Sequence, residues 1–299
     1  MGSIIEKVSL YGWNNCYKLS AGDCEIVVTA DVGPRIISFG KKGGENLLNI
    51  VEEQAGRSGD DEWLAYGGHR VWAAPEEEYL TYLPDNDAVL VEIDEKENTI
   101  RLTRSADESR LERSLQLRVA TTGEFVIRNE ILNRGEEPIR TASWGITAFV
   151  PGGIGILPLI RQPESGKQFQ SDFSLNLWHY TDLSDPAYEW HKEAIVVHQD
   201  RCLSPQKIGY WLKAPLLGYL VNGSLIKKKT DVNTEESQNY PDRGSNTEVY
   251  FNPSFIELET LSPWRTLSQG ESVWHEEYLS LIDVAGNESL PSLIELLLG

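Results

Sequence analysis

Short runs of β-forming residues, each ended by turn-forming residues, recur along almost the whole chain. Some runs alternate apolar and polar residues, as in 99–103 and 115–119, whereas others are short and apolar, as in 35–39. Alternation with a period of two puts the apolar side chains on one face, which is typical of half-buried strands. The pattern predicts strands at 24–29, 35–39, 88–93, 99–103, 111–119, 125–132, 139–149, 217–221, 224–229, 248–252 and 255–261.

Turn-forming residues separate these runs at short intervals. Asn222-Gly223 stands between two of the predicted strands and indicates a two-residue hairpin turn. Turn signals about every 8–12 residues are typical of a large antiparallel sandwich or barrel. We therefore expect an all-β, mostly antiparallel fold. One short terminal helix is predicted at 292–298, with Ser289 as its cap and Pro291 in its first turn.

Neither a repeat nor a composition break divides the 299 residues, so we expect one domain over 1–299. The most irregular stretch is 152–186, which holds several Gly, Pro and aromatic residues. It is interpreted as a long loop excursion, and long loops in compact domains are usually functional or disordered.

The charge of the chain disfavours some partners. There are 27 basic and 46 acidic residues, a formal net charge of −19. Nucleic-acid binding needs clustered Lys and Arg, and anionic membrane surfaces attract the same residues, so neither partner is expected. No apolar run approaches the roughly 18 residues that span a bilayer, and residues 1–7 do not resemble a signal peptide.

The cysteines and histidines predict neither a disulfide framework nor a metal site. Cys16, Cys24 and Cys202 are few and lack zinc-site spacing, which favours a reducing, cytoplasmic environment. Residues 40–44 lack the phosphate-loop pattern, and no Gly-x-Ser-x-Gly occurs. We expect no cofactor and no metal; metal-ligand spacing is also lacking around His179, His191, His198 and His275.

The segment 63–87 is the first candidate site, because it combines aromatic, cationic and acidic residues. On an extended backbone His69 lies on one face, and Arg70 and Trp72 lie on the other. Trp63 or Trp72 is suited to stack on a sugar ring, and Arg70 to hold hydroxyls or a carboxylate, with Glu76 as a further ligand. The alternative is a surface loop whose tryptophans plug the edge of the sandwich.

The strand 255–261 is the second candidate. Glu257 and Glu259 are two residues apart, so both carboxylates project from one face, with Cβ atoms about 7 Å apart. On a solvent-exposed face they are simply a polar surface. On a concave sheet, like charges should raise the pKa of one carboxyl and create a proton-transfer site. The sequence leaves both alternatives open, although the flanking Pro253 and Pro263 favour the mouth of a site.

The turn around 239–245 is a weaker candidate. Tyr240 and Asp242 precede a predicted strand, and Pro241-Asp242-Arg243-Gly244 is typical turn chemistry. Asp242 is therefore more typical of a turn residue than of a ligand. Three further tryptophans, Trp144, Trp264 and Trp274, are expected in the core.

Three segments together resemble the galactose-mutarotase-like, or aldose 1-epimerase-like, superfamily. They are Gly-Gly-His-Arg-Val-Trp-Ala-Ala-Pro-Glu at 67–76, Tyr-Pro-Asp at 240–242 and Phe-Ile-Glu-Leu-Glu-Thr-Leu-Ser-Pro at 255–263. The likeness spans about residues 11–281, includes Gly-Pro-Arg-Ile-Ile-Ser-Phe at 33–39, and is most specific to an uncharacterised branch of the superfamily. The resemblance implies a β-supersandwich that binds sugar on a concave face.

The resemblance also implies roles for single residues. In mutarotases a carboxylate on a late strand removes the proton of the anomeric hydroxyl and a histidine protonates the ring oxygen. The base corresponds to Glu259, which Glu257 would tune, and an earlier histidine corresponds loosely to His69. The position of the usual acid histidine is occupied here by Thr147, and a threonine hydroxyl does not have the pKa that a proton donor needs.

The sequence therefore predicts a carbohydrate-active protein that binds a small sugar or sugar acid. In the catalytic version, an aldose epimerase, Glu259 is the base and His69 the acid. Sugar ligands would be Arg70, Trp72, Trp63, Glu76, Asp242, Tyr240 and Glu257. The alternatives are a non-catalytic carbohydrate-binding protein, a relative of polysaccharide lyases or hydrolases, and an interaction protein with a plugged groove.

Overall fold

Two antiparallel β-sheets make up most of the structure, a computed structural model that describes residues 5–159, 169, 173–232, 236, 239–286 and 288–299. The first sheet, in spatial order, consists of β1 (Ile5–Leu10), β2 (Trp13–Ala21), β3 (Cys24–Thr29), β4 (Arg35–Lys41), β5 (His69–Ala74), β10 (Ile139–Phe149), β19 (Phe255–Leu261), β18 (Thr247–Asn252), β15 (Gln206–Tyr210) and β12 (Leu175–Leu177). An additional short strand, β20 (Arg265–Leu267), pairs with β10.

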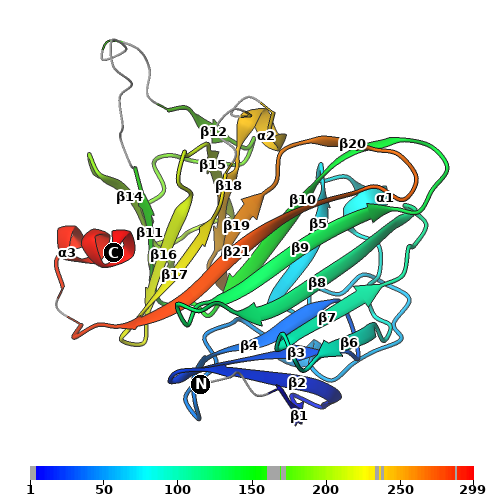
Figure 1. Cartoon of the computed structure of the whole chain (residues 1–299). Helices are drawn as coiled ribbons and strands as arrows, with labels where there is room; N and C mark the ends of the chain where they lie inside the picture. The colour runs from blue at the N-terminus through cyan, green and yellow to red at the C-terminus, as the bar shows by residue number, and fades with distance from the viewer. Residues whose placement is uncertain (1–4, 160–168, 170–172, 233–235, 237–238, 287) are drawn as a thin grey trace.

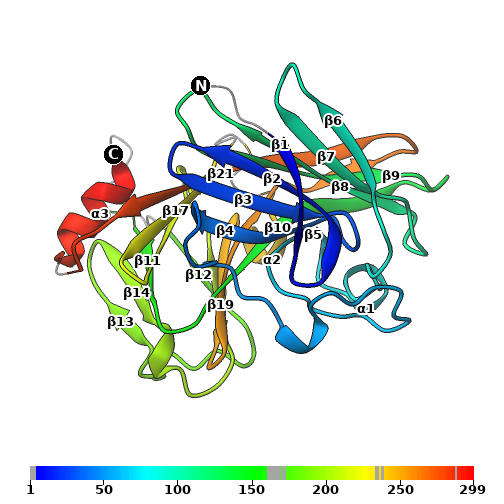
Figure 2. The ribbon, with the colours of Figure 1, turned by 90° about the horizontal axis from the view of Figure 1, so that it is seen from below.

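The second sheet lies against the first. Its spatial order is β13 (Tyr188–Trp190), β14 (Ala194–His198), β11 (Ile154–Pro158), β16 (Leu216–Val221), β17 (Ser224–Thr230), β21 (Ser272–Asp283), β9 (Phe125–Asn133), β8 (Leu111–Val119), β7 (Thr99–Arg104) and β6 (Leu90–Asp94). In Figure 1 the long strands β8, β9 and β21 pass in front of β5 and β10, and Figure 2 shows the same layering from below.

The apolar faces of the two sheets form the main core. Alternate residues such as Leu115 and Leu117 of β8 and Ile256 and Leu258 of β19 are fully buried there. Phe39 of β4 meets Phe125 of β9 edge to face, with ring centroids 6.0 Å apart. The predicted period of two is thus the physical basis of the sandwich, and the predicted all-β fold is confirmed.

The hairpin and helix signals are also confirmed. Asn222 and Gly223 both have positive φ, 49° and 72°, as a two-residue turn between β16 and β17 requires. Helix α3 (Leu290–Leu298) begins after Ser289, whose hydroxyl accepts a hydrogen bond from the backbone N–H of Ser292. Leu293 and Leu297 pack on the outer face of the second sheet, at the end marked C in Figure 1.

Two expectations are wrong. The stretch 152–186 is not one loop, because Ile154–Pro158 forms β11 inside the second sheet; its glycine and proline hide the strand signal. A Cβ on Gly155 would lie 3.1 Å from Ile256 Cδ1 and 3.3 Å from Val197 Cβ, so a larger residue would have to shift these side chains slightly. Residues 160–168 and 170–172 of the stretch lie outside the described residues. Trp274 is not in the core: it is 47% exposed on β21.

The remaining helical elements are short. They are α1 (Glu78–Thr81), α2 (Pro241–Gly244) and two 3₁₀ turns, Glu52–Gln54 and Gln199–Arg201. None of the helices in the described part of the chain has the length and apolar character needed to cross a bilayer.

Candidate functional site

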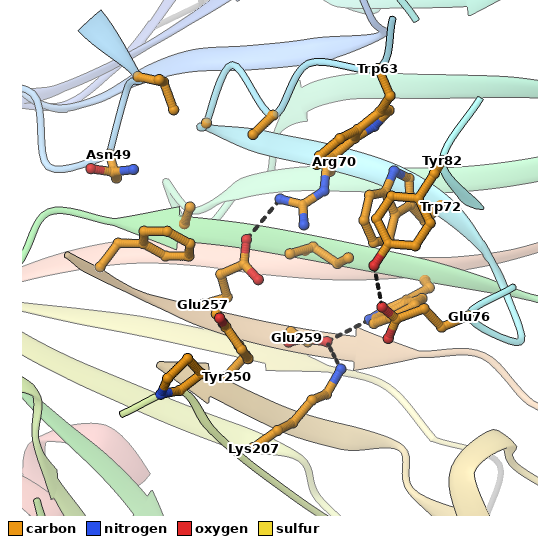
Figure 3. A pocket seen from close by; sticks show the side chains of 18 of the residues that line it. Asn49, Trp63, Arg70, Trp72, Glu76, Tyr82, Lys207, Tyr250, Glu257 and Glu259 are labelled. Carbon is orange, nitrogen blue, oxygen red and sulfur yellow. Dashed lines mark hydrogen bonds and ion pairs between the residues drawn. The ribbon is translucent and has the colours of Figure 1, made fainter. Parts of the chain in front are cut away.

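A cavity of about 540 Å³ opens on the face of the first sheet that is turned away from the second sheet. Figure 3 shows it from close by. Its aromatic lining residues are Trp63, Trp72, Tyr82, Trp144, Tyr180, Tyr250 and Phe255, and its charged ones are Arg70, Glu76, Lys207, Glu257 and Glu259. Segments far apart in the chain therefore meet in one hollow.

Strand register explains which residues meet there. Arg70 pairs with Ile146 of β10, and Ile146 pairs with Glu259 of β19, so these three side chains form one row on one face. The neighbouring row contains Glu257, Tyr250 and Lys207. Period-two alternation then carries Trp72 onto the same face as Arg70.

The glycines before β5 bring it close to its neighbours. Gly67 and Gly68 have φ values of 88° and 72°, a region that side chains rarely adopt. A Cβ on Gly68 would lie 2.0 Å from the carbonyl oxygen of Ile36, and one on Gly67 would lie 2.1 Å from that of Asn49. The glycine pair thus lets the chain before β5 lie directly against Ile36 and Asn49, and this close approach positions Arg70 at the cavity.

Arg70 is held by a carboxylate and by an aromatic ring. Its Nη1 donates to Glu257 Oε1 over 2.8 Å, and its guanidinium carbon lies 4.2 Å from the centre of the Trp72 ring. The side chains of Arg70 and Glu257 are 8% and 10% exposed, so the pair is largely shielded from water. The charge of Arg70 is therefore already matched within the cavity.

Glu259 is the most deeply buried carboxylate of the lining, at 1% exposure. Its Oε2 accepts hydrogen bonds from Trp144 Nε1 at 2.8 Å and from Lys207 Nζ at 2.9 Å. Burial raises the pKa of Glu259, and the nearby charge of Glu257 adds to the rise, although Lys207 opposes it. Glu259 therefore holds a proton more readily than an exposed glutamate does.

Lys207 links Glu259 to a carboxylate behind the cavity. Its Nζ lies 2.8 Å from Glu248 Oε2 and 2.9 Å from Glu259 Oε2, and it also sits 4.5 Å from the centre of the Trp144 ring. Burial lowers the pKa of Lys207, but the two carboxylates outweigh burial and raise it well above its usual range. Burial also raises the pKa of Glu248 well above its usual range, with Lys207 acting against it.

The aromatic residues form a continuous wall at one end of the cavity. Trp72 contacts the rings of Trp63, Tyr82 and Trp144, with centroids 5.9, 5.4 and 5.5 Å away. Tyr82 donates a short hydrogen bond to Glu76, and Figure 3 shows these two side chains meeting beside Trp72. Such a wall offers flat apolar faces beside polar groups.

His69 does not share the cavity with Glu259. It precedes Arg70 in β5, so its side chain points to the opposite face, between the sheets, where it is fully buried. Its ring nitrogens lie 2.9 Å from Thr147 Oγ1 and 2.9 Å from Asn129 Oδ1. The expected meeting of His69 and Glu259 in one hollow is therefore not what the structure has, because adjacent strand residues face opposite sides.

A charged cluster surrounds His69 in the inter-sheet layer. Lys228 Nζ lies 2.9 Å from Glu277 Oε1 and 2.9 Å from Thr147 Oγ1, and His275 Nε2 lies 3.6 Å from Glu277 Oε1. Burial lowers the pKa of His69 to about 4, although Glu277 acts against this. His69 is thus a neutral hydrogen-bonding residue of the interior, and Thr147 belongs to the same cluster.

The other predicted site residues divide into two groups. Trp63, Trp72, Arg70, Glu76 and Glu257 all line the cavity together with Glu259. Tyr240 and Asp242 do not appear in its lining: Tyr240 is buried, and Asp242 forms the α2 turn with a φ of 47°. Asp242 does lie close enough to Glu248 to raise the pKa of that carboxyl.

The sequence analysis did not identify several of the lining residues as site residues. Lys207, Tyr180 and Tyr250 come from segments without a recognisable motif, and Trp144 was expected only in the core. An alternation signal at 206–210, Gln-Lys-Ile-Gly-Tyr, could have shown that Lys207 shares a face with Gly209 rather than with Ile208. Nothing in the sequence indicated its partners, because these lie on other strands.

The part of the chain that the structure describes contains no group of three or more His, Cys, Asp and Glu side chains able to hold a metal ion. Both cations of the cavity lining are ion-paired, and its carboxylates contact Arg70, Lys207 or Tyr82. The arrangement can accept hydrogen bonds from hydroxyl groups and can exchange protons at Glu259.

Solved structures share this fold. A galactose mutarotase-like protein from Lactobacillus casei superposes with a TM-score of 0.61 at 8% identity, covering 90% of this chain and 100% of its own. One from Clostridium acetobutylicum gives a TM-score of 0.54 at 12% identity, covering 95% and 99%. A galactose mutarotase related enzyme from Lactobacillus acidophilus gives 0.52 at 11% identity, covering 92% and 100%. The chain therefore has a galactose mutarotase-like fold.

Sequence comparisons add no closer relative. No protein-family model matches the chain, and no curated protein matches it either.

Proposed function

We propose that the cavity binds a single sugar ring and that the protein interconverts the anomers of that sugar, with Glu259 as the base. The observation that carries this proposal is the position of Glu259. Its carboxylate is almost fully buried, lines the cavity, and lies beside tryptophan rings and a second carboxylate. The opening of a hemiacetal needs a base for the hydroxyl proton, and flat apolar rings beside that base can bind the sugar.

The size and wall of the cavity suit a small carbohydrate. Ligand pockets of proteins commonly enclose about 300–1,000 Å³, and this one encloses about 540 Å³. The rings of Trp63 and Trp72 can cover the C–H face of a sugar, which removes apolar surface from water. Glu257, Glu76 and Arg70 surround them with groups that bind hydroxyls.

The environment of Glu259 supports a role in proton transfer. Burial raises the pKa of Glu259, which makes this carboxylate a stronger base than an exposed glutamate. In ring opening, Glu259 would accept the proton of the anomeric hydroxyl, and the ring oxygen would need a proton from a second group. The likeness to galactose mutarotase-like structures supports the same chemistry.

A non-catalytic sugar-binding protein is the second candidate, and one observation favours it. His69 corresponds loosely to an earlier mutarotase histidine, and Thr147 stands at the position of the acid histidine; both face the inter-sheet layer. If another group does not supply the proton, the cavity binds sugar without turning it over.

The two candidates are separated by measuring binding and exchange on the same sugars. Saturation-transfer NMR on a panel of neutral aldoses, uronic acids and sugar phosphates identifies the ligand. Two-dimensional exchange NMR then compares the rate of anomer exchange with and without protein. Acceleration above buffer supports the epimerase, binding without acceleration supports the binding protein, and no binding to any sugar contradicts both.

A further inference from the structure

We propose that Lys207 is the proton donor of this site: its Nζ would protonate the ring oxygen while Glu259 removes the proton of the anomeric hydroxyl. This inference rests on the proposed epimerase function and names the group that supplies its second proton. Two lining residues donate to Glu259, Trp144 through Nε1 and Lys207 through Nζ, and of these two the ammonium of Lys207 is the one that can release a proton.

The geometry of the pair fits the two oxygens of a hemiacetal. Lys207 Nζ and Glu259 Oε2 are 2.9 Å apart, and both residues line the cavity. The anomeric hydroxyl and the ring oxygen are bonded to the same carbon, so an acid and a base side by side can reach both. Figure 3 shows Lys207 and Glu259 approaching each other from neighbouring parts of the sheet.

Lys207 has a donor left for a ligand. An ammonium has three N–H donors; Glu259 accepts one of them, and Glu248 lies within ion-pair distance, 2.8 Å from Nζ. Its side chain is 4% exposed, so bulk water competes little for the remaining donor. The rings of Trp144 and Trp178, 4.5 and 4.9 Å from Nζ, keep the ammonium close to Glu259.

The electrostatics couple the two proton transfers. Lys207 lies between two carboxylates, which hold its proton firmly while both are charged. When Glu259 takes a proton from the sugar, one of these negative charges disappears, and Lys207 becomes a stronger acid at that moment. The 2.8 Å contact of Nζ with Glu248 remains and keeps the amine in place for the return of the proton.

The step balances without any further reactant. The O–H bond of the anomeric hydroxyl breaks as Glu259 gains its proton, the C1–O5 bond breaks as C1=O1 forms, and O5 takes a proton from Lys207. After rotation about C1–C2, O5 returns the proton to the neutral amine and attacks C1. Glu259 then gives its proton to O1, which completes the other anomer.

The test compares three variants by exchange NMR and calorimetry on the sugar that wild type turns over. Lys207→Arg keeps a cation beside Glu248 and Glu259, but a guanidinium does not release its proton. Lys207→Met/Glu248→Gln removes one charge of each sign, so the net charge around Glu259 stays the same. Lys192→Met makes the same chemical change at a site whose side chain is 81% exposed.

We expect Lys207→Arg and the double variant to bind sugar within about threefold of wild type and to lose about 10²–10⁴ in kcat, the range for a general acid. Lys192→Met should match wild type. Full activity of a folded Lys207→Arg or of the double variant would overturn the proposal and leave the epimerase intact. A wild type that accelerates exchange of no sugar would overturn the epimerase and, with it, the role of Lys207.

Discussion

Arg70 and Glu257 are 187 residues apart in the chain, and their side chains meet in the cavity with Arg70 Nη1 2.8 Å from Glu257 Oε1. This ion pair bears on whether the site takes neutral sugars or sugar acids. The lining holds the three carboxylates Glu76, Glu257 and Glu259 but only the two cations Arg70 and Lys207 among the described residues. Both cations are paired, so an acidic sugar finds no unmatched positive charge in the cavity.

We therefore expect Glu257→Gln to shift the preference toward uronic acids. The substitution frees the guanidinium of Arg70 to bind a carboxylate, and a hydrogen bond to a charged group contributes about 1.5–3 kcal/mol, or about tenfold or more in affinity. Calorimetry with galactose and galacturonate measures the ratio. Glu76→Gln is the matched control, because it removes the same charge from a residue bonded to Tyr82 rather than to a cation. Equal shifts in both variants would contradict the role of Arg70.

Trp63, at the outer end of the tryptophan wall, should contribute more to sugar affinity than to the stability of the fold. Trp63 is only partly buried, whereas Trp72 and Trp144 are buried among their neighbours. Trp63→Ala should lower sugar affinity by about 1–2 kcal/mol, as expected from some tens of Å² of apolar surface at about 25 cal/mol per Å². Fluorescence titration and thermal melting measure the two effects. An unchanged affinity would place the sugar away from this wall.

The buried histidine predicts how stability depends on pH. The pKa of His69 is about 4 in the folded chain and near 6.5 when unfolded, so the unfolded state binds more protons between these values. The stabilisation is present above pH 6.5 and is lost as the pH falls to 4, by about 3 kcal/mol in all. Burial raises the pKa of Glu277, but Lys228, His69 and His275 together outweigh burial and hold it well below its usual range, which adds a further loss below pH 4.5.

Urea unfolding at pH 7.5, 6.0 and 5.0 measures this dependence. His69→Gln removes the titrating ring, so its stability should change less with pH over this window than that of wild type. The same slope in both proteins would mean that His69 does not carry the loss. Because these measurements report unfolding, they are independent of any sugar.

The Lys228–Glu277 pair should behave as a buried ion pair. Both side chains are at most 1% exposed, so removing one partner leaves an uncompensated charge in the interior. Glu277→Gln should cost about 3–5 kcal/mol, and Lys228→Met/Glu277→Gln should recover much of it. The surface pair Lys18–Glu6, with side chains 26% and 50% exposed, is the control and should cost about 1 kcal/mol or less. A single variant as stable as the double would contradict this account.

Sequence reasoning predicted the local structure well because each strand's signal is local. The ranges 24–29, 111–119, 139–149 and 255–261 coincide with β3, β8, β10 and β19. Alternation also placed Glu257 and Glu259 on one face and separated His69 from Arg70. The resemblance nevertheless led to the pairing of His69 with Glu259, which the alternation of β5 does not allow.

The rest depends on contacts between distant strands. Lys207 meets Glu248 and Glu259 only because β15, β18 and β19 are neighbours in the first sheet, an order that no short motif encodes. Likewise, the pattern of 255–261 could not tell a solvent-exposed face from a cavity, since this depends on what covers it. Trp63 and Tyr82 help to enclose the site. Trp63 lies in a loop, and Tyr82 directly follows α1.

Two-dimensional exchange NMR with wild type and with Glu259→Gln tests the central claim most directly. It measures the rate of exchange between the α and β anomers in the presence of each protein. The account predicts that wild type accelerates exchange of at least one neutral aldose. Glu259→Gln keeps the hydrogen bond of Trp144 but cannot accept the proton, so it should lower kcat by about 10²–10⁴ with little change in sugar affinity. Equal exchange rates over both proteins would contradict the account.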